Sequence, residues 1–142
     1  MATSVAMRPK SGVGADQIDF NRLAATWEYG QAVVMFASFS SAHAALPPST
    51  VNLTMQAIEG VVRVFRVKKV KTIGSTVMLV GGIDDPRTRQ EQLTGVVDAA
   101  IMIRECVFPH ANVAGLTYRI GIHSGPCFGA VIGGNGAIFD LF

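Results

Sequence analysis

The chain has few charged residues, only two cysteines and no long hydrophobic run. Asp, Glu, Lys and Arg make up 15% of its 142 residues, and a net charge of +2 is too small to favour nucleic acid or an anionic membrane as a partner. Cys106 and Cys127 are too few for a disulfide framework or a metal knuckle, so we expect buried thiols in a reducing compartment. No segment approaches the roughly 18 uninterrupted apolar residues of a membrane span.

The N-terminal segment lacks the apolar core and cleavage site of a secretory signal. The Ser, Gly and Pro residues of "MATSVAMRPKSGVGADQ" predict a flexible leader over residues 1–26, followed by one domain over residues 27–142. Without a span or a signal, we expect a cytoplasmic location, or the cytosolic side of a membrane through regions outside this chain.

Hydrophobic patterning predicts strands alternating with helices. A nearly continuous apolar run over residues 31–39 is typical of a strand covered on both faces. A helix follows a cap at Ser49 or Thr50, and two strands then flank Gly74. The apolar face of this helix is expected to consist of Val51, Met55, Ile58, Val61, Val62 and Phe65.

A second helix is predicted after "DDP" at residues 84–86, with Asp85 as its cap and Pro86 at its first position. Its apolar face is expected to consist of Leu93, Val96, Val97, Ala100 and Ile101. "LTYRIGIHSG", from residue 116, predicts a strand, and a Gly-Pro turn separates it from a further strand that begins at residue 126.

This order of elements predicts an α+β fold, a ferredoxin-like or polymerase-palm split βαβ sheet with two helices on one face. The final residues, "GAIFDLF", are apolar and lack a closing helix or polar tail. Because finished domains rarely leave a hydrophobic edge uncovered, we expect a fold that is incomplete at the C-terminus or covered there by something else.

Three segments, in this order, resemble the class III nucleotide cyclase catalytic domain. "VVMFASF" is similar to the first strand of that family, "VKKVKTIGSTVML" to its central hairpin, and "YRIGIHSGPCFGAVIGG" with "FDLF" to its later strands and base-binding segment. The resemblance runs from about Gly30 to Phe142. It implies a dimer of two such domains with an active site at their interface. In heterodimeric adenylyl cyclases, one half carries the metals and the other half reads the base.

The resemblance places this chain in the base-reading half. Family members hold two Mg²⁺ ions with two Asp side chains, and the ions lower the pKa of the ribose 3′-oxygen that attacks the α-phosphorus. Here those positions are Ser38 and Ser75, and a neutral hydroxyl is a poor ligand for Mg²⁺. We therefore expect no metal ligand in this chain, with Mg²⁺ or Mn²⁺ supplied by a partner domain. The same resemblance suggests that the two serines line a degenerate second pocket.

Lys71 and Asp140 occupy the family's two base-reading positions, which indicates adenine rather than guanine. Adenine offers an acceptor at N1 and a donor amine at C6, which complement an ammonium and a carboxylate, whereas guanine reverses both. Each mismatch costs about 1–3 kcal/mol, so two mismatches give ATP a preference of about 30-fold to several thousand-fold. Leu141 is expected to pack beside the base.

The family's transition-state Asn and Arg, and a phosphate-binding Lys, follow the "FDLF" segment, so no catalytic residue is expected here and the chain alone should be inactive. The expected partners are ATP and a second cyclase domain, in a hetero- or homodimer. The alternative is a catalytically inactive pseudo-cyclase, a regulatory dimerisation or nucleotide-binding module. An RNA-recognition domain is disfavoured because "YRIGIHSG" lacks its aromatic pattern. A diguanylate-forming relative would need acidic residues where "GST" stands.

Overall fold

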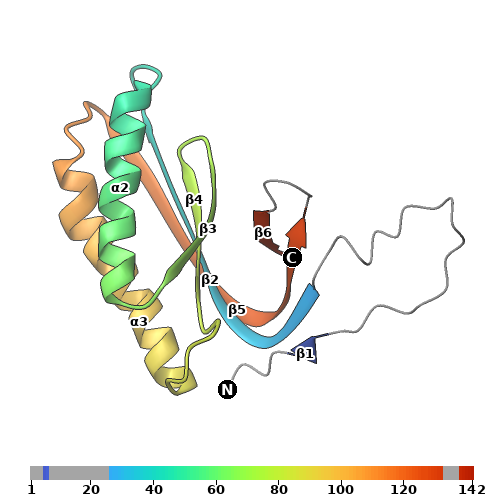
Figure 1. The fold of residues 1–142 in the computed structure, drawn as a ribbon. Coiled ribbons are helices and arrows are strands. Elements are labelled where there is room, and N and C mark those ends of the chain that lie inside the picture. The colour runs from blue at the N-terminus through green and yellow to red at the C-terminus, as the bar shows by residue number, and fades with distance from the viewer. Residues whose placement is uncertain (1–4, 7–25, 133–137) are drawn as a thin grey trace, which may run out of the picture.

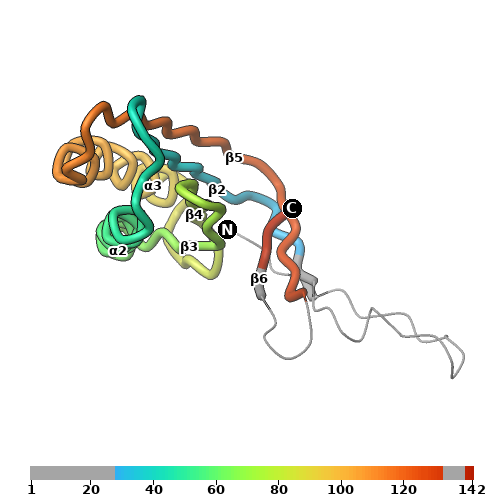
Figure 2. Tube along the Cα trace, turned by 90° about the horizontal axis from the view of Figure 1, so that it is seen from above, coloured from blue at the N-terminus to red at the C-terminus, as the bar shows by residue number. Residues whose placement is uncertain are grey.

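An antiparallel sheet with helices on one face makes up the described part of the chain. The computed structural model describes residues 5–6, 26–132 and 138–142. The strand order is β3–β4–β2–β5–β6, and the short strand β1 (Val5–Ala6) pairs with β2. Figures 1 and 2 show both helices against the same face, which we call the helix face; the opposite one is the open face.

The central strand, β2 (Thr26–Ser41), contains the predicted run 31–39 and is longer than that run at both ends. Strands β4 (Thr76–Gly81) and β5 (Leu116–Ile132) pair with it on its two sides. Alternate residues of β2 point into the core beneath the helices, as the period of two in a strand requires. These buried residues are Val33, Met35, Ala37 and Phe39.

Helix α2 (Pro48–Val64) buries the predicted face but begins differently from the prediction. Met55, Ile58 and Val62 are buried, and the other three predicted residues pack against the same core. The N-cap is Pro47, not Ser49 or Thr50, and it makes no side-chain cap hydrogen bond. Pro48 takes the first helical position, where its fixed φ fits and its missing N–H costs no helical bond.

Helix α3 (Arg89–Met102) is capped by Thr88 rather than Asp85. Thr88 and Glu91 form a reciprocal capping box, which satisfies two backbone N–H groups at the helix start. Asp85 instead accepts hydrogen bonds from the backbone and guanidinium of Arg87, which also donates to the carbonyl of Phe65. The helix continues into a π-helical turn (Ile103–Val107) and a 3₁₀ turn (Phe108–His110).

The predicted burial on α3 is right for only part of its face. Val96 and Ala100 are buried and Leu93 packs against the core, but Val97 and Ile101 are exposed. The expectation for the cysteines is likewise half right, because Cys127 is buried and Cys106 is exposed.

The predicted turn at residues 125–126 is wrong. β5 runs unbroken through Gly125 and Pro126, and both of its halves pair with β2. The register shifts between Tyr29 and Ala32, opposite this dipeptide, so a bulge in β2 faces the proline, which has no N–H to donate. The two strands bend together beyond the middle of the sheet (Figure 1).

The bent end of the sheet brings the last strand near the hairpin. β6 (Ile138–Leu141) pairs antiparallel with β5, and β3 (Lys68–Ile73) pairs with β4 around the predicted turn at Gly74. A second apolar cluster fills the space on the open face between them. It consists of Tyr29, Ala32, Met78, Val80, Ile83, Cys127 and Leu141.

The architecture confirms the predicted α+β fold with two helices on one face of a split βαβ sheet. Of the predicted leader, the structure describes Val5–Ala6, which pair with Trp27 and Glu28, and the start of β2. The rest of residues 1–26 lies outside the described residues. In the described ranges, no helix has the length and apolar character that crossing a bilayer requires.

Candidate base-binding site

Lys71 lies on β3, at the outer edge of the sheet, with its side chain on the open face. Its partner across the hairpin is Met78, which belongs to the open-face cluster, whereas the neighbouring Thr72 pairs with Val77 of the helix-face core. A bulge between Lys69 and Lys71 shifts the register of the strand pair. The two lysines therefore lie on opposite faces of the sheet, although residues two apart in a regular strand lie on the same face.

Lys71 and Asp140, which are 69 residues apart in sequence, form an ion pair. The Nζ of Lys71 donates to Oδ2 of Asp140 at 2.8 Å. The side chains are 34% and 20% exposed, so both remain reachable from solvent. The structure thus brings the two predicted base readers together in one place.

The carboxylate of Asp140 is held at both oxygens. Its Oδ1 accepts a hydrogen bond from the backbone N–H of Leu141 at 2.8 Å, while Oδ2 accepts from Lys71. The hydrogen bond from Lys71 is the main cause of a pKa for Asp140 below its ordinary value, so the carboxylate is charged at neutral pH. Leu141 itself is buried in the open-face cluster, where it anchors β6.

Ser38 and Ser75 lie on neighbouring strands near the hairpin tip. Ser38 is opposite Thr76, whose hydroxyl donates to the Ser38 hydroxyl at 3.0 Å. The backbone N–H of Phe39 donates to the carbonyl of Ser75 at 3.1 Å. Ser75 lines a cavity of about 790 Å³, but Ser38 is not among the residues that line it.

The residues present do not fit a magnesium ion. Ser38 and Ser75 offer neutral hydroxyls where Mg²⁺ prefers carboxylates, and the Ser38 hydroxyl is engaged with Thr76. Within the described ranges, no group of three or more His, Cys, Asp or Glu side chains is placed to hold a metal ion.

Arg119 is a further candidate that the sequence reasoning missed. It lies on β5 directly opposite Ser38, and it is exposed. A guanidinium in this position suits the oxygens of a phosphate group. The only sequence signal for Arg119 is the alternation of "YRIGIH", which places Arg119 and Gly121 on one face of a strand. The alternation does not reveal that Arg119 lies opposite Ser38, because that depends on the register between β5 and β2.

Comparisons with known proteins agree with this fold. The sequence model described as the adenylate and guanylate cyclase catalytic domain matches residues 30–142, and the chain belongs to this class III nucleotide cyclase family. It is 31% identical over 117 residues to a receptor-type guanylate cyclase of Caenorhabditis elegans, covering 80% of this chain but only 9% of that protein.

Two solved structures illustrate the similarity of fold. One is the guanylate cyclase domain of RhGC from Catenaria anguillulae in complex with GTP, with a TM-score of 0.68, 24% identity, and coverage of 81% of this chain and 67% of that one. The other is the adenylyl cyclase CyaB from P. aeruginosa, with a TM-score of 0.70, 14% identity, and coverage of 82% and 67%. Both adenylyl and guanylyl cyclases are similar to this chain, so the comparisons do not distinguish ATP from GTP as its substrate.

Proposed function

We propose that this chain supplies adenine recognition to an adenylyl cyclase, which converts ATP to cyclic AMP and pyrophosphate. The observation that carries the proposal is the pairing of Lys71 with Asp140, an ammonium beside a carboxylate, at the two positions that the family resemblance assigns to base reading. Leu141 supports the site from beneath, because its buried side chain and its backbone N–H both fix β6.

The Lys71–Asp140 pair has hydrogen-bonding capacity left for adenine. A lysine ammonium has three donors, and one of them is used by Asp140, so another is free for adenine N1. Each carboxylate oxygen of Asp140 accepts one bond and keeps a second lone pair for the amine at C6. Guanine would instead place its N1–H against the ammonium and O6 against the carboxylate, which leaves buried groups unsatisfied at about 1–3 kcal/mol each.

The metal-dependent half of the reaction is assigned to a partner domain. Two divalent ions lower the pKa of the attacking 3′-oxygen when they are bound. Ser38 and Ser75 are poor ligands for them, so a metal-bearing cyclase domain must complete the active site. Within this chain, Lys71 and Asp140 orient the base. We propose a location in the cytoplasm or at the cytosolic side of a membrane.

The decisive experiment exchanges the two base readers. The chain, with any sequence that its gene encodes beyond Phe142, is assayed with a metal-bearing cyclase domain on ATP and GTP. We expect Lys71→Glu with Asp140→Cys to lower the ratio of kcat/KM for ATP over GTP by at least about 30-fold, because both polar matches to adenine are lost. Lys68→Glu is the matched control, since Lys68 lies on the same strand and pairs only weakly with Asp84 at 3.8 Å. An unchanged ratio in the double variant would show that these residues do not read the base.

A regulatory pseudo-cyclase is the second candidate function. It is favoured by the neutral Ser38 and Ser75, and by the direct bond between Lys71 and Asp140, which a bound base would have to share. This alternative predicts nucleotide binding or dimerisation without cyclic AMP formation, even when a competent metal-bearing domain is present. The same assay therefore distinguishes the two functions through turnover.

A further inference from the structure

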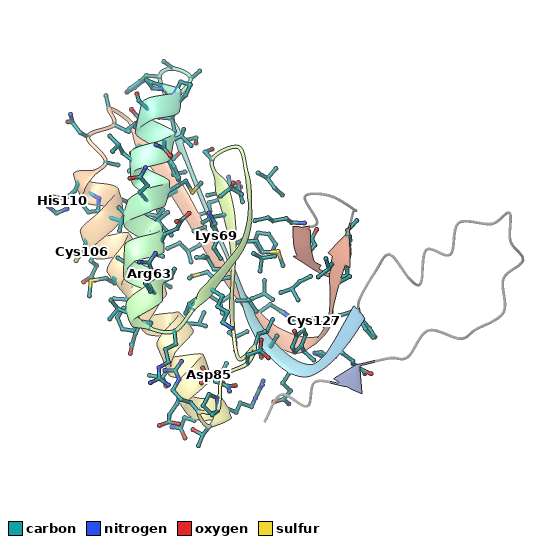
Figure 3. The ribbon with its side chains drawn as sticks, viewed as in Figure 1. Arg63, Lys69, Asp85, Cys106, His110 and Cys127 are labelled. Carbon is teal, nitrogen blue, oxygen red and sulfur yellow. The ribbon has the colours of Figure 1, made fainter. Side chains whose placement is uncertain are left out.

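A cavity of about 330 Å³ lies between the end of α2 and the β4–α3 loop, and we call it the α2-end cavity. Val67 of the helix-face core and Ile83 of the open-face cluster are both buried and form its apolar floor. Figure 3 shows Arg63 near the end of α2 and Asp85 in the loop, and both line the cavity. No base-reading residue lines it, so the α2-end cavity is separate from the base-reading site.

Hydrogen bonds join the two walls of the α2-end cavity. The guanidinium of Arg87 donates to the carbonyl of Phe65 at the end of α2 and to the carboxylate of Asp85 in the loop. The backbone N–H of Val67 donates to the carbonyl of Val62 at 2.9 Å, which is the bond that closes a Schellman motif at the helix end. A ligand therefore meets walls that are already tied together.

Two residues that line the α2-end cavity have a left-handed backbone conformation. Arg66 has a φ of +57° and Asp84 a φ of +50°. Within the described ranges, Asn112 is the only other non-glycine residue with a positive φ. Arg66 occupies the position of the Schellman motif where glycine is the usual residue, so an arginine there costs stability. Because backbone strain of this kind clusters at functional sites, the side chain of Arg66 is the part that we expect to have a function.

The α2-end cavity has two cations to which the described residues offer no ion pair. Asp84 lies 3.8 Å from Lys68, and Asp85 is bonded to the guanidinium named above, so each acidic lining residue has a cation beside it. Arg63 and Arg66 are exposed, and no described carboxylate forms an ion pair with either of them. A guanidinium matches the geometry of a phosphate group, and two of them balance the charge of about −1.5 to −2 that a phosphate monoester carries at pH 7.

We propose that the α2-end cavity binds a small organic phosphate. The oxygens of a phosphate monoester meet the guanidinium groups of Arg63 and Arg66, and its apolar body lies on the floor of Val67 and Ile83. The cavity volume is at the lower end of the range of about 300–1,000 Å³ that is typical of small-molecule sites, so the body is small, such as a single ring. This inference does not depend on the proposed recognition of adenine.

The first test uses compounds that share a phenyl ring and differ in charge. At about pH 7.5, phenyl phosphate is mainly a dianion, phenyl sulfate is a monoanion and phenol is uncharged. Titration of the full chain, followed by NMR of the Val67 and Ile83 methyl groups, should show phenyl phosphate binding at least about tenfold more tightly than the other two compounds. Inorganic phosphate, which cannot contact the apolar floor, should also bind more weakly than phenyl phosphate.

Three results of this titration would overturn the proposal. Phenyl sulfate binding as tightly as phenyl phosphate would refute the ligand class, and inorganic phosphate doing so would refute the role of the floor. Methyl shifts confined to Met78 on the open face would place the ligand elsewhere. Sedimentation of the chain with vesicles that contain phosphatidic acid, without any binding of phenyl phosphate, would assign the cavity to a lipid headgroup instead of a small molecule.

The second test uses the strained position. Arg66→Gly removes a guanidinium and also relieves the left-handed backbone. We therefore expect at least about a tenfold loss of phenyl phosphate affinity, with a midpoint of urea unfolding at least as high as that of the unmodified chain. Asn112→Gly is the matched control, because Asn112 has a φ of +51° and does not line the cavity, so the affinity should not change. Unchanged affinity in Arg66→Gly would refute the site.

The third test removes the other guanidinium. Arg63→Gln keeps a good helix former on α2 and should also weaken phenyl phosphate binding at least about tenfold. Arg104→Gln is the matched control, because Arg104 is exposed, does not line the cavity and is bonded to Glu105. An equal loss in both variants would mean that the ligand responds to net charge and not to this cavity. Lys71→Gln, in the base-reading pair, should leave the affinity unchanged, so this test fails or succeeds independently of the proposed function.

Discussion

The carboxylate of Asp140 is bonded at one oxygen to a side chain from a distant strand and at the other to its own backbone. Lys71 reaches it from β3 and the Leu141 N–H from within β6. This ion pair joins the four-residue strand β6 to the hairpin, beside the apolar contacts of Leu141 in the open-face cluster. The structural role of this contact can be measured separately from the proposed role in base recognition.

The structural role predicts a pH dependence of stability. The pKa of Asp140 is lowered in the folded protein, mainly by the hydrogen bond from Lys71. A carboxyl with a lowered folded pKa stabilises the fold above its unfolded pKa, and this contribution is lost as the pH falls through the folded value. We expect Asp140→Asn to flatten the change in unfolding free energy below about pH 5, as measured by urea denaturation from pH 2 to pH 7.

A double-mutant cycle gives the size of that contribution. Both side chains are partly exposed, so we expect a coupling energy between Lys71→Met and Asp140→Asn of about 0.5–1 kcal/mol at pH 7. The coupling should vanish near pH 2, where the carboxylate is protonated. A coupling that is absent at pH 7, or that persists unchanged at pH 2, would show that the ion pair does not hold β6.

At the residue scale, the sequence named the two residues but not the bonds between them. The family resemblance singled out Lys71 and Asp140, and the structure places them 2.8 Å apart. Their direct bond, and the second bond from the Leu141 N–H, depend on the bend of β5 and on the hairpin bulge. Neither feature has a local sequence signal. Arg119 was missed for the same reason, since its relation to Ser38 appears only in the strand register.

Two glycines with equally open surroundings show how the local element decides the effect of a substitution. A Cβ at Gly74 or at Gly60 would meet nothing within 4 Å. Gly74 is at the hairpin turn with φ of +59°, whereas Gly60 is inside α2. We expect Gly74→Ala to destabilise the fold by about 1–2 kcal/mol and Gly60→Ala to stabilise it by about 0.5–1 kcal/mol.

Urea unfolding midpoints of the two alanine variants test this contrast, and each variant serves as the control for the other. Changes of the same sign would mean that backbone conformation at the hairpin tip does not govern its stability.

The elements themselves are largely predictable, and the failures have local causes. The buried face of α2 was predicted correctly, because large apolar side chains that recur with a period of 3.6 residues define one face of a helix. The cap of α3 was misassigned because "DDPRT" offers two acidic residues and a threonine, and only the reciprocal bond to Glu91 selects Thr88. The dipeptide at 125–126 reads as a turn, but a bulge in β2 allows the proline to remain within a strand.

At the scale of the whole molecule, the presence of base-reading groups without metal-binding carboxylates favours an enzyme made of two different domains. In the proposed assignment, Lys71 and Asp140 supply an ammonium and a carboxylate for a purine, whereas Ser38 and Ser75 stand at the two metal positions. A homodimer would repeat the serines in each half, so pairing two copies would not supply the missing carboxylates. The chain covers 67% of each of the two solved cyclase chains.

The chain on its own should be inactive, and two substitutions should give it a site for a divalent metal ion. Incubated with ATP and Mg²⁺ or Mn²⁺, the purified chain should form no cyclic AMP, because Ser38 and Ser75 stand where a pair of carboxylates would hold the ions. Ser38→Asp with Ser75→Asp should create such a pair, since the two positions adjoin across β2 and β4. We expect at least about tenfold tighter Mn²⁺ binding, measured by electron paramagnetic resonance titration.

Ser49→Asp with Ser124→Asp is the matched control, because it adds the same charge at two exposed positions on separate elements. It should leave Mn²⁺ binding at the level of the unmodified chain. Tight Mn²⁺ binding by the unmodified chain, or cyclic AMP formation that rises in proportion to its concentration, would contradict the assignment of the metal ions to a partner. Equal Mn²⁺ affinity in the two double variants would instead show that Ser38 and Ser75 do not form one site.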